Sequence, residues 1–398
     1  MSFNKKIKIG IYSGEIPSSK FIENLIVGLS RYFPVYVYGT LNENISYKSE
    51  HIKVYSISKS KVKRISVLLY RLIMLSIFDI NTFYKLIKKI KLFSTPRTDF
   101  KYLEKIVPIM LYRTDILHFQ WATSLKYFDD VLDELTTIVS LRGSLINIKP
   151  FINSQISDEY INTFKKVNFF HAVSEDIKEV AKQFISTDKT IRVIKPAVNE
   201  SLMGLNKNKV DFSKIKKLKI ISVGGNKWVK GFTYSIDAMK ILKDMDMNFE
   251  YTLIAPGEDN QKLKYQIDNL ELENHIKYIP GLNHDDVIKE LSQNHIYLLS
   301  SVSEGIANVV IESMAIGTLV ISTNCGGMHE VISDGNNGFL VPIRSPKLMA
   351  EKIIMVSKSN NKKIRKIISN AKNTIKSNHL LCDQIDEMRD FYSKVLDT

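Results

Sequence analysis

The chain has 398 residues, which is too long for one ordinary hydrophobic core and predicts two domains. Its 44% hydrophobic and 25% charged residues are typical of a soluble globular protein, and its two cysteines, Cys325 and Cys382, exclude a disulfide framework and indicate a reducing compartment. No recognised nucleic-acid-binding motif accompanies the net charge of +14, which makes nucleic acid a poor candidate for the partner.

Short β-rich segments alternate with helical patterns along the whole chain. Near-continuous apolar strands separated by helices predict parallel sheets that are covered on both faces. The segments form two series, so we predict an α/β protein with two Rossmann-like domains. We place the first domain at residues 1–196, a polar linker at 197–217 and the second domain at 218–380. The predicted strands are 7–12, 35–38, 52–57, 116–119, 137–141, 169–173 and 191–194, then 218–223, 251–254, 276–279, 295–299, 319–322 and 338–341.

The N-terminal segment gives no sign of export. Residues 1–9 are basic, but the apolar run that follows is typical of a strand and breaks at Gly14, so we expect no secretory signal. A membrane-spanning helix needs ~20 apolar residues, and the best stretch, 65–78, is shorter and interrupted by Arg71. We therefore expect a cytoplasmic protein.

The positive charge is concentrated between Lys59 and Lys91. This segment holds nine Lys or Arg residues against one acid, Asp79, and the cations are interleaved with apolar residues. Such a pattern is typical of basic amphipathic helices that lie on an anionic bilayer, here the cytoplasmic face of the inner membrane. The alternative is a helix pair that packs its apolar faces on the domain and leaves its lysines solvated.

Two polar residues come at the ends of predicted strands in the first domain. His118 closes the strand 116–119, where a histidine is as often a satisfied structural residue as a functional one. Arg142 follows the strand 137–141. A guanidinium cannot act as a base, but its planar fork suits a phosphate or an acidic acceptor.

A glycine turn with a lysine opens the second domain. The sequence Val223-Gly-Gly-Asn-Lys-Trp-Val-Lys-Gly231 follows one strand and precedes a helix. Lys230 at the end of this turn can neutralise the negative charge of a departing diphosphate. Further on, Asp244-Met-Asp246 matches a metal-binding Asp-x-Asp motif, but it falls in a polar turn where acids are common, and we expect no metal site.

The stretch from Ser300 to Pro342 is the most informative part of the chain. Residues 306–317 are apolar almost all round, as in a helix buried on both sides, yet they include Glu312. A buried carboxylate needs fixed hydrogen-bond partners or the hydroxyls of a ligand. The turn before the helix holds Glu304, and a helix start suits phosphate. At ~1.5 Å per residue, the two glutamates lie roughly 10 Å apart, a span that one nucleotide diphosphate can bridge.

These residues resemble the donor-binding signature of glycosyltransferase family 4, which is a family of retaining enzymes with the two-domain GT-B fold. The resemblance rests on the E-x7-E pair Glu304 and Glu312, the turn Gly326-Gly327-x-x-Glu330 and the Gly-Phe-Leu-Val strand. It implies that a nucleotide diphosphate sugar, rather than a cofactor, binds the second domain. Within that site, Glu312 would bind the ribose, Glu304 the sugar, and the backbone of Gly305, Ile306, Ala307 and Asn308 the phosphates.

The same resemblance extends less strongly to other positions. It implies that Gly224 belongs to the diphosphate loop, that Gly281 borders the nucleotide base, and that Gly14 lies near the cleft, although a plain strand-to-helix turn explains Gly14 equally well. His118 matches the family's Asp-x-x-His, and Arg142 stands where some members have histidine, so both are candidate catalytic residues beside Lys230 and Glu304. Gly225 departs from the family, which usually has arginine there. The helix 381–398 would cross back to the first domain.

The resemblance predicts a retaining, metal-independent hexosyltransferase that acts on a glycan or lipid-linked acceptor, in polysaccharide or lipopolysaccharide synthesis. A sugar-nucleotide epimerase shares the fold, but the catalytic acids of those enzymes are not evident in this sequence. A phosphorylase would need a pyridoxal-binding lysine context, which is also not evident. A catalytically degenerate nucleotide-sugar binder remains an alternative, because Gly225 removes one expected diphosphate cation.

Overall fold

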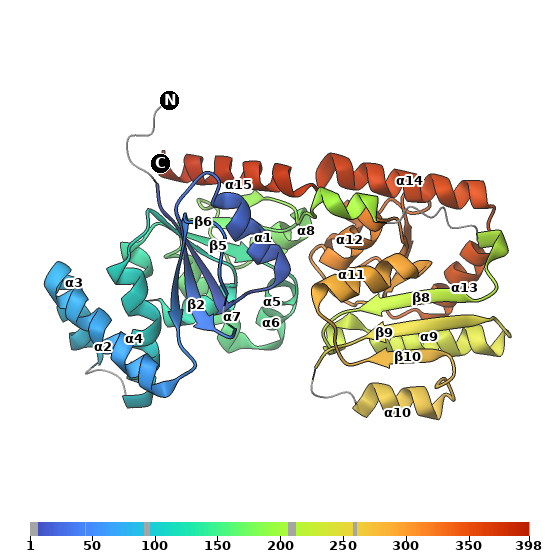
Figure 1. The fold of residues 1–398 in the computed structure, drawn as a ribbon, viewed down its shortest axis with the longest axis horizontal. Helices are drawn as coiled ribbons and strands as arrows, with labels where there is room; N and C mark the ends of the chain where they lie inside the picture. The colour runs from blue at the N-terminus through green and yellow to red at the C-terminus, as the bar shows by residue number, and fades with distance from the viewer. Residues whose placement is uncertain are drawn as a thin grey trace.

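The computed structural model describes residues 7–43, 45–90, 96–129, 131–205, 212–257 and 261–397. These residues form two parallel sheets, each flanked by helices (Figure 1). The first sheet has seven strands in the order β3-β2-β1-β4-β5-β6-β7. Its strands are β1 (Ile9–Ile16), β2 (Val35–Leu41), β3 (Ile52–Ile57), β4 (Ile116–Phe119), β5 (Thr137–Leu141), β6 (Phe169–Ala172) and β7 (Thr190–Val193).

The second sheet has six strands in the order β10-β9-β8-β11-β12-β13, and all neighbours are parallel. Both sheets thus start from a central strand, run outward to one edge and return to the other side, which is the doubly wound order. The predicted α/β class with two Rossmann-like domains is confirmed. The strands are β8 (Leu218–Val223), β9 (Phe249–Ile254), β10 (Ile276–Ile279), β11 (Ile296–Leu299), β12 (Leu319–Thr323) and β13 (Phe339–Val341).

Helices cover both faces of each sheet, which explains why the strands have apolar side chains on both sides. In the first domain the helices are α1 (Lys20–Leu29), α2 (Lys61–Phe78), α3 (Ile80–Ile90), α4 (Pro96–Leu111), α5 (Ser144–Asn147), α6 (Lys149–Ile152), α7 (Ser154–Phe164) and α8 (Glu175–Ala181). The helices that follow the first domain in the sequence are α9 (Phe232–Asp244), α10 (Gln261–Asn269), α11 (His284–Gln293), α12 (Asn308–Ile316), α13 (Pro346–Ser357), α14 (Asn361–Asn378) and α15 (Leu381–Leu396).

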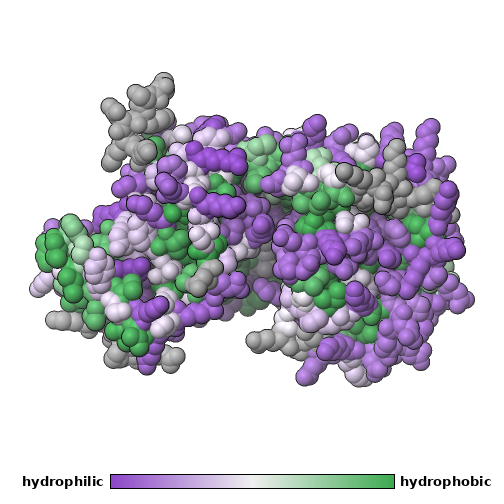
Figure 2. All heavy atoms as spheres, viewed as in Figure 1, coloured by the Kyte–Doolittle hydropathy of each residue, from purple (hydrophilic) through white to green (hydrophobic). Residues whose placement is uncertain are grey.

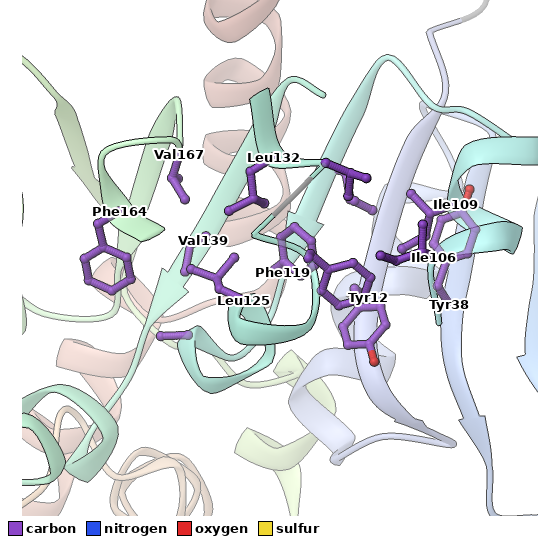
Figure 3. Packing of buried hydrophobic residues seen from close by; sticks show 14 of the residues in the cluster. Tyr12, Tyr38, Ile106, Ile109, Phe119, Leu125, Leu132, Val139, Phe164 and Val167 are labelled. Carbon is purple, nitrogen blue, oxygen red and sulfur yellow. The ribbon is translucent and has the colours of Figure 1, made fainter. Parts of the chain in front are cut away.

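Aliphatic and aromatic side chains together fill the core on one face of the first sheet (Figure 3). Tyr12 from β1 meets Phe128 edge-on, with ring centroids 4.8 Å apart, and Phe119 from β4 lies 5.0 Å from the same ring. Each large ring buries extensive apolar area, and tilted pairs of this kind add about 0.5–1.5 kcal/mol. This core fixes the ends of β1, β4 and β5, from which the first-domain side of the site begins.

The last helix, α15, packs on the first domain, whereas α14 lies over the second (Figure 1). Ile385, Met388 and Phe391 of α15 join the core formed by Ile9 and Ile11 of β1. Helix α1 approaches so closely that a Cβ at Gly28 would lie 2.4 Å from Ile385 Cδ1. Glycine at this position therefore permits the two helices to touch.

The chain crosses between the domains twice, and the two crossings are bonded to each other. The Val198 amide donates to the His379 carbonyl at 2.9 Å, and the Leu381 amide donates to the Val198 carbonyl at 2.9 Å. The predicted linker is thus not a free tether, because its 3-10 helix Glu200–Gly204 also packs against α12. Linker residues 206–211 lie outside the described residues.

Candidate active site between the two domains

A cleft of about 450 Å³ opens where the two domains face each other. From the first domain, Trp121 and residues 142–145 line it. From the second domain, it is lined by the loop after β8, with Gly224, Gly225 and Lys230, and by residues 303–309 before and within α12. Both loops of the second domain follow the carboxyl ends of the neighbouring strands β8 and β11, where ligands bind in doubly wound sheets.

Lys230 and Glu304 form an ion pair in this cleft. Lys230 Nζ lies 2.6 Å from Glu304 Oε1, and the side chains are only 24% and 13% exposed. The Ser301 hydroxyl donates to the same oxygen at 2.7 Å. Two of the predicted catalytic residues are therefore brought together, and their charges are held at one fixed point of the cleft.

The β8 loop and the β11 loop interlock through backbone contacts. Gly231 has a φ of 61°, and a Cβ there would lie 2.2 Å from the Ser300 carbonyl oxygen. The Ser300 hydroxyl donates to the Lys230 carbonyl at 2.9 Å, and the Val302 amide donates to the Val229 carbonyl at 2.8 Å. Only glycine combines this left-handed conformation with so close an approach. This loop geometry directs the Lys230 side chain over Gly224, where a Cβ would lie 3.2 Å from Lys230 Cδ.

Helix α12 begins at Asn308, two residues later than the sequence predicts. Ala307 occupies the N-cap position and supplies no side-chain acceptor to the first turn. Residues 305–309 line the cleft beside Lys230, so the amides of this first turn and the positive end of the helix dipole are directed to it. An anion such as phosphate fits this place.

Glu312 is not the lone charge that the apolar helix suggested. Its carboxylate is 12% exposed, and Oε1 lies 2.9 Å from His284 Nε2 at the start of α11. This hydrogen bond raises the pKa of His284 above its ordinary value. Both side chains line a second cavity of about 340 Å³ that shares Phe21 and Asn308 with the cleft. A ligand that reaches from Glu304 to Glu312 therefore passes the start of α12.

Arg142 lies on the first-domain wall of the cleft. Its guanidinium carbon is 4.8 Å from the centre of the Phe21 ring and 6.0 Å from the Trp121 ring. Nη2 donates to the Gln120 side-chain oxygen at 3.0 Å and to the Ser140 hydroxyl at 3.4 Å. Burial lowers the pKa of Arg142 to about 10, so it stays charged at neutral pH.

His118 does not line the cleft, which corrects its expected place. Its ring is fully buried, with Nδ1 2.7 Å from the Tyr392 hydroxyl and Nε2 2.9 Å from the Ser140 hydroxyl. Ser140 also contacts His171 Nδ1 at 2.8 Å. Burial, together with His171 and Arg142, lowers the pKa of His118 well below its ordinary value. His118 therefore links α15 to the first sheet as a neutral structural residue.

The predicted glycines Gly14 and Gly281, and Gly225 where arginine was expected, have different places. Gly225 lines the cleft, and a Cβ there would meet no atom within 4 Å. Gly14 has a φ of 84° and lies beside Trp121, which itself lines the cleft. Gly281 lines neither of the two cavities described above, and a Cβ there would contact Pro256. The structure thus brings Gly225 into the site, leaves Gly14 at its margin and does not bring in Gly281.

Glu330, from the Gly-Gly-x-x-Glu turn, joins the two domains. Its Oε1 accepts a hydrogen bond from the Asp176 amide in the first turn of α8 at 3.0 Å, and its Oε2 lies 3.3 Å from Lys195 Nζ. A carboxylate at a helix start is favourable because of the helix dipole. In the same turn, a Cβ at Gly326 would lie 2.0 Å from the Glu304 carbonyl oxygen. The turn therefore packs closely against the backbone of the loop that holds Glu304.

Asp244 and Asp246 lie away from the cleft, at the end of α9 and just after it. Asp244 forms an ion pair with Lys240 one turn earlier on that helix. Over the residues that the structure describes, no group of three or more His, Cys, Asp or Glu side chains is arranged to hold a metal ion.

Sequence reasoning missed four residues of the site: Phe21, Trp121, Ser301 and His284. The segment Asn283-His284-Asp285-Asp286 does contain a helix-start signal, since the Asn283 side chain accepts from the Asp286 amide at 2.9 Å. That signal places His284 in the first turn of α11, but only the packing of α11 beside α12 brings it to Glu312.

Part of the chain matches a known family in sequence. Residues 206–374 match the family model of glycosyl transferases group 1. The amylovoran biosynthesis glycosyltransferase AmsK of Erwinia amylovora is 26% identical over 254 residues, which are 61% of this chain and 60% of AmsK. The chain spans about 60% or less of the length of the first curated relatives that it matches.

Solved structures resemble the whole chain. A glycosyltransferase from Rickettsia africae has a TM-score of 0.69 and 20% identity, with 98% of this chain and 99% of that chain covered. HepE of Anabaena in complex with UDP-glucose has a TM-score of 0.71 and 17% identity, with 98% and 100% covered. At these identities the likeness concerns the fold. Residues 206–374 thus match the family model of glycosyl transferases group 1, and the chain as a whole has the GT-B fold.

Proposed function

We propose that this protein is a retaining, metal-independent glycosyltransferase that moves a hexose from a nucleotide diphosphate sugar to an acceptor. The observation that carries the proposal is the cleft itself, where the Lys230–Glu304 pair, the start of α12 and Glu312 follow one another. The cation and the helix start suit a diphosphate, and the two part-buried carboxylates suit the hydroxyls of a sugar and a ribose. The structure of HepE in complex with UDP-glucose supports the choice of donor class.

In this proposal Glu312 accepts hydrogen bonds from the ribose hydroxyls, and Glu304 accepts them from the sugar. The amides of residues 305–308 bind the phosphates. Lys230 faces the oxygen that gains charge as the bond between the sugar and the phosphate breaks, and a fixed cation there stabilises the transition state. Because Glu304 already holds Lys230 in place, little reorganisation is needed when the donor binds.

The chemical step needs no basic side chain. The acceptor hydroxyl oxygen bonds to the anomeric carbon on the face from which the diphosphate leaves, and its proton passes to the leaving phosphate oxygen. A step without a base agrees with the first-domain side of the cleft, where the charged lining residue is Arg142, and a guanidinium cannot accept a proton. By analogy with the name of AmsK, we propose an acceptor in the synthesis of a cell-surface polysaccharide or lipopolysaccharide, either a glycan or a lipid-linked sugar.

We further propose that the first domain rests on an anionic membrane, at the cytoplasmic face. Helices α2 and α3 expose apolar side chains that we call the α2–α3 surface, and Ile77 and Phe78 are 68% and 71% exposed. Figure 2 shows these hydrophobic residues gathered at the end of the molecule farthest from the second domain. The α2–α3 surface consists of Val62, Leu69, Tyr70, Ile73, Ile77, Phe78, Ile80 and Tyr84.

The exposure of this surface argues against the alternative that both helices bury their apolar faces on the domain. Helix α2 does bury Leu68 and Leu75, but its other apolar side chains point outward. Exposed cations flank the surface at Lys61, Lys63 and Lys88. Apolar side chains bordered by lysines suit the boundary between headgroups and acyl chains of an anionic bilayer. Over the described part of the chain, no helix is both long and apolar enough to span a bilayer.

Not every cation of this segment is available. Arg64 pairs with the buried Glu104 of α4, and Nε donates to Glu104 Oε1 at 2.6 Å, so Arg64 fastens α2 to the domain. Lys91 and the side chain of Lys89 lie outside the described residues. Lys85 pairs with Glu134, and Arg71 donates to the Ser56 carbonyl. Among the cations of α2 and α3, the membrane proposal therefore rests on Lys61, Lys63 and Lys88.

The test of the main proposal is a thermal-shift screen of nucleotide diphosphates and their sugars, because a ligand that binds the native state raises its unfolding temperature. A donor that stabilises the protein is then incubated with and without EDTA, and release of nucleotide diphosphate is measured. We expect stabilisation and slow hydrolysis or transfer that EDTA does not stop. Stabilisation without turnover would indicate a degenerate binder, and epimerised donor would indicate an epimerase. Activity that EDTA abolishes and manganese restores would refute metal independence.

A further inference from the structure

Arg142 is a cationic side chain in the cleft with no carboxylate partner among the described residues. Its hydrogen bonds go to two neutral groups, Gln120 and Ser140. Nη1 makes no hydrogen bond with any described residue, and Nε is buried without an acceptor. A part-buried charge without an opposite charge costs free energy that a ligand's negative charge offsets. Burial is also the cause that lowers the pKa of Arg142.

Three carboxylates in or near the cleft are engaged with other cations. Glu304 pairs with Lys230, Glu312 with His284, and Glu330 with Lys195. The Arg142 guanidinium instead lies over the rings of Phe21 and Trp121. Rings hold a planar guanidinium by its face and leave its edge of N–H donors for a ligand. The side chain is therefore oriented in advance, with the N–H donors of Nη1 left for an acceptor oxygen of an anion.

We propose that Arg142 binds a carboxylate or phosphate on the acceptor, so that the acceptor of this transferase is an acidic molecule such as a uronic acid or a sugar phosphate. This inference rests on the proposed function, and it names the substrate class of the same cleft. The donor's diphosphate is the less suitable anion, since Lys230 and the start of α12 serve it from the second domain. Arg142 extends from the opposite wall, at the end of β5.

The two walls approach each other at the position next to Arg142. A Cβ on Gly143 would lie 3.8 Å from the Gly305 amide nitrogen, so the first-domain loop nearly touches the residues that start the phosphate site. An acceptor group held by Arg142 is thus close to the expected sugar position beside Glu304. Holding one end of the acceptor there orients its hydroxyl, which is the usual means by which an arginine clamp accelerates transfer.

The experiment uses the fluorescence of Trp121, whose ring borders Arg142. The chain has two tryptophans, and the other, Trp228, is 64% exposed, so Trp228→Phe isolates the reporter. This protein, saturated with UDP (or with GDP if UDP does not bind), is titrated with glucose 6-phosphate, glucuronate and glucose. We expect at least one acidic probe to bind about tenfold or more tightly than glucose, the scale of a charge-assisted hydrogen bond.

In Arg142→Gln this preference for the acidic probes disappears, whereas Arg142→Lys retains part of it. Lys126→Gln, which removes an exposed charge from the same domain, keeps the full preference. Acidic probes that bind no better than glucose, or that bind equally well to Arg142→Gln, would overturn the inference. A tenfold loss of UDP affinity in Arg142→Gln would assign Arg142 to the donor and overturn it as well. If no nucleotide diphosphate binds the unaltered protein, the proposed function itself fails.

Discussion

Lys230 Nζ and Glu304 Oε1 lie 2.6 Å apart, although the two residues are separated by more than 70 positions in the chain. The two side chains follow β8 and β11, which are neighbours in the second sheet, so the fold pairs them without help from the first domain. A donor that enters the cleft therefore meets a cation already oriented by a carboxylate. The pair can serve the departing group and the sugar at once.

We predict that Lys230→Ala lowers kcat by about 10²–10³, because the variant loses the cation that faces the charge developing on the diphosphate. Steady-state kinetics with the donor found in the screen measure this. Lys227→Ala is the matched control, since Lys227 lines the same cleft from the same loop but is exposed. A rise in KM alone would make Lys230 a uniform binder rather than a transition-state contact.

Glu312→Gln should weaken nucleotide binding by about 1–3 kcal/mol, the usual effect of losing a charge-assisted hydrogen bond. Isothermal titration calorimetry with the nucleotide diphosphate measures the change. Glu290→Gln on the neighbouring helix α11 removes a glutamate that lines neither cavity, and its affinity should match that of the unaltered protein. Equal affinity in both variants, with unfolding temperatures intact, would rule out a ribose contact by Glu312.

Gly225→Arg should tighten binding of nucleotide diphosphates by about tenfold, because it places a guanidinium where the donor-binding signature that this loop resembles usually has one. The structure has room for it, since a Cβ at this position meets no atom within 4 Å. Gly225→Gln controls for the added bulk and should bind as the unaltered protein does. If the arginine and glutamine variants bind alike, the cation at this position has no role here.

Folding stability should fall as the pH drops below about 6.5, because His118 and His171 are buried as neutral side chains. Burial lowers the pKa of His171 to about 3, with Arg142 adding to the effect, and lowers that of His118 well below its ordinary value. At pH values between the pKa of the unfolded chain and these lower pKa values, the unfolded chain binds more protons than the folded protein. Each histidine therefore lowers the free energy of unfolding by about 1.4 kcal/mol per pH unit as the pH falls.

Urea unfolding from pH 8 to pH 5 measures this slope, and His118→Gln should reduce it. His284 acts in the opposite direction, since its pKa is raised by Glu312 and its contribution is lost as the pH rises. Glu312→Gln removes that contribution and is measured in parallel. A slope that His118→Gln leaves unchanged would mean that His118 does not stay neutral in the folded protein.

The protein should sediment with anionic liposomes but not with zwitterionic ones. Each lysine near an anionic surface contributes about 1 kcal/mol and is screened by salt, so raised salt should weaken binding. We expect the same loss when Lys61, Lys63 and Lys88 are changed to Gln, and when Ile77 and Phe78 are changed to Ser. Changing the exposed Lys362, Lys363 and Lys366 of α14 instead should have little effect. Equal partitioning to both liposome types, or to neither, would contradict the docking proposal.

The strands were predictable because their apolar runs are short, nearly continuous and bounded by polar residues. Ile52–Ile57, Ile116–Phe119 and Ile276–Ile279 end where the sequence predicts. The second-domain side of the cleft was also predictable, since Glu304 and Lys230 both follow strands of one parallel sheet. A regular fold brings such positions together.

Long-range packing explains what the sequence did not reveal. His118 stands at a strand end, as a cleft residue would, but Tyr392 from α15 covers it, and no local pattern records that contact. Glu312 meets His284 for a similar reason, because the partner comes from another helix. Arg64 looked like one more surface cation until its pairing with Glu104 of α4 was visible. Pairings between separate elements depend on their relative placement, which periodicity does not specify.

The position of α15 affects the order in which the protein is completed during synthesis. The ribosome releases the first domain before the second, but the core around Ile9 and Ile11 lacks one wall until residues 381–396 have emerged. The domain translated first is thus the last to be finished. Until then, the apolar face of α1 lacks its cover and His118 lacks its hydroxyl partner Tyr392. A nascent chain from which α14 but not α15 has emerged would therefore carry a closed second domain and an open first one.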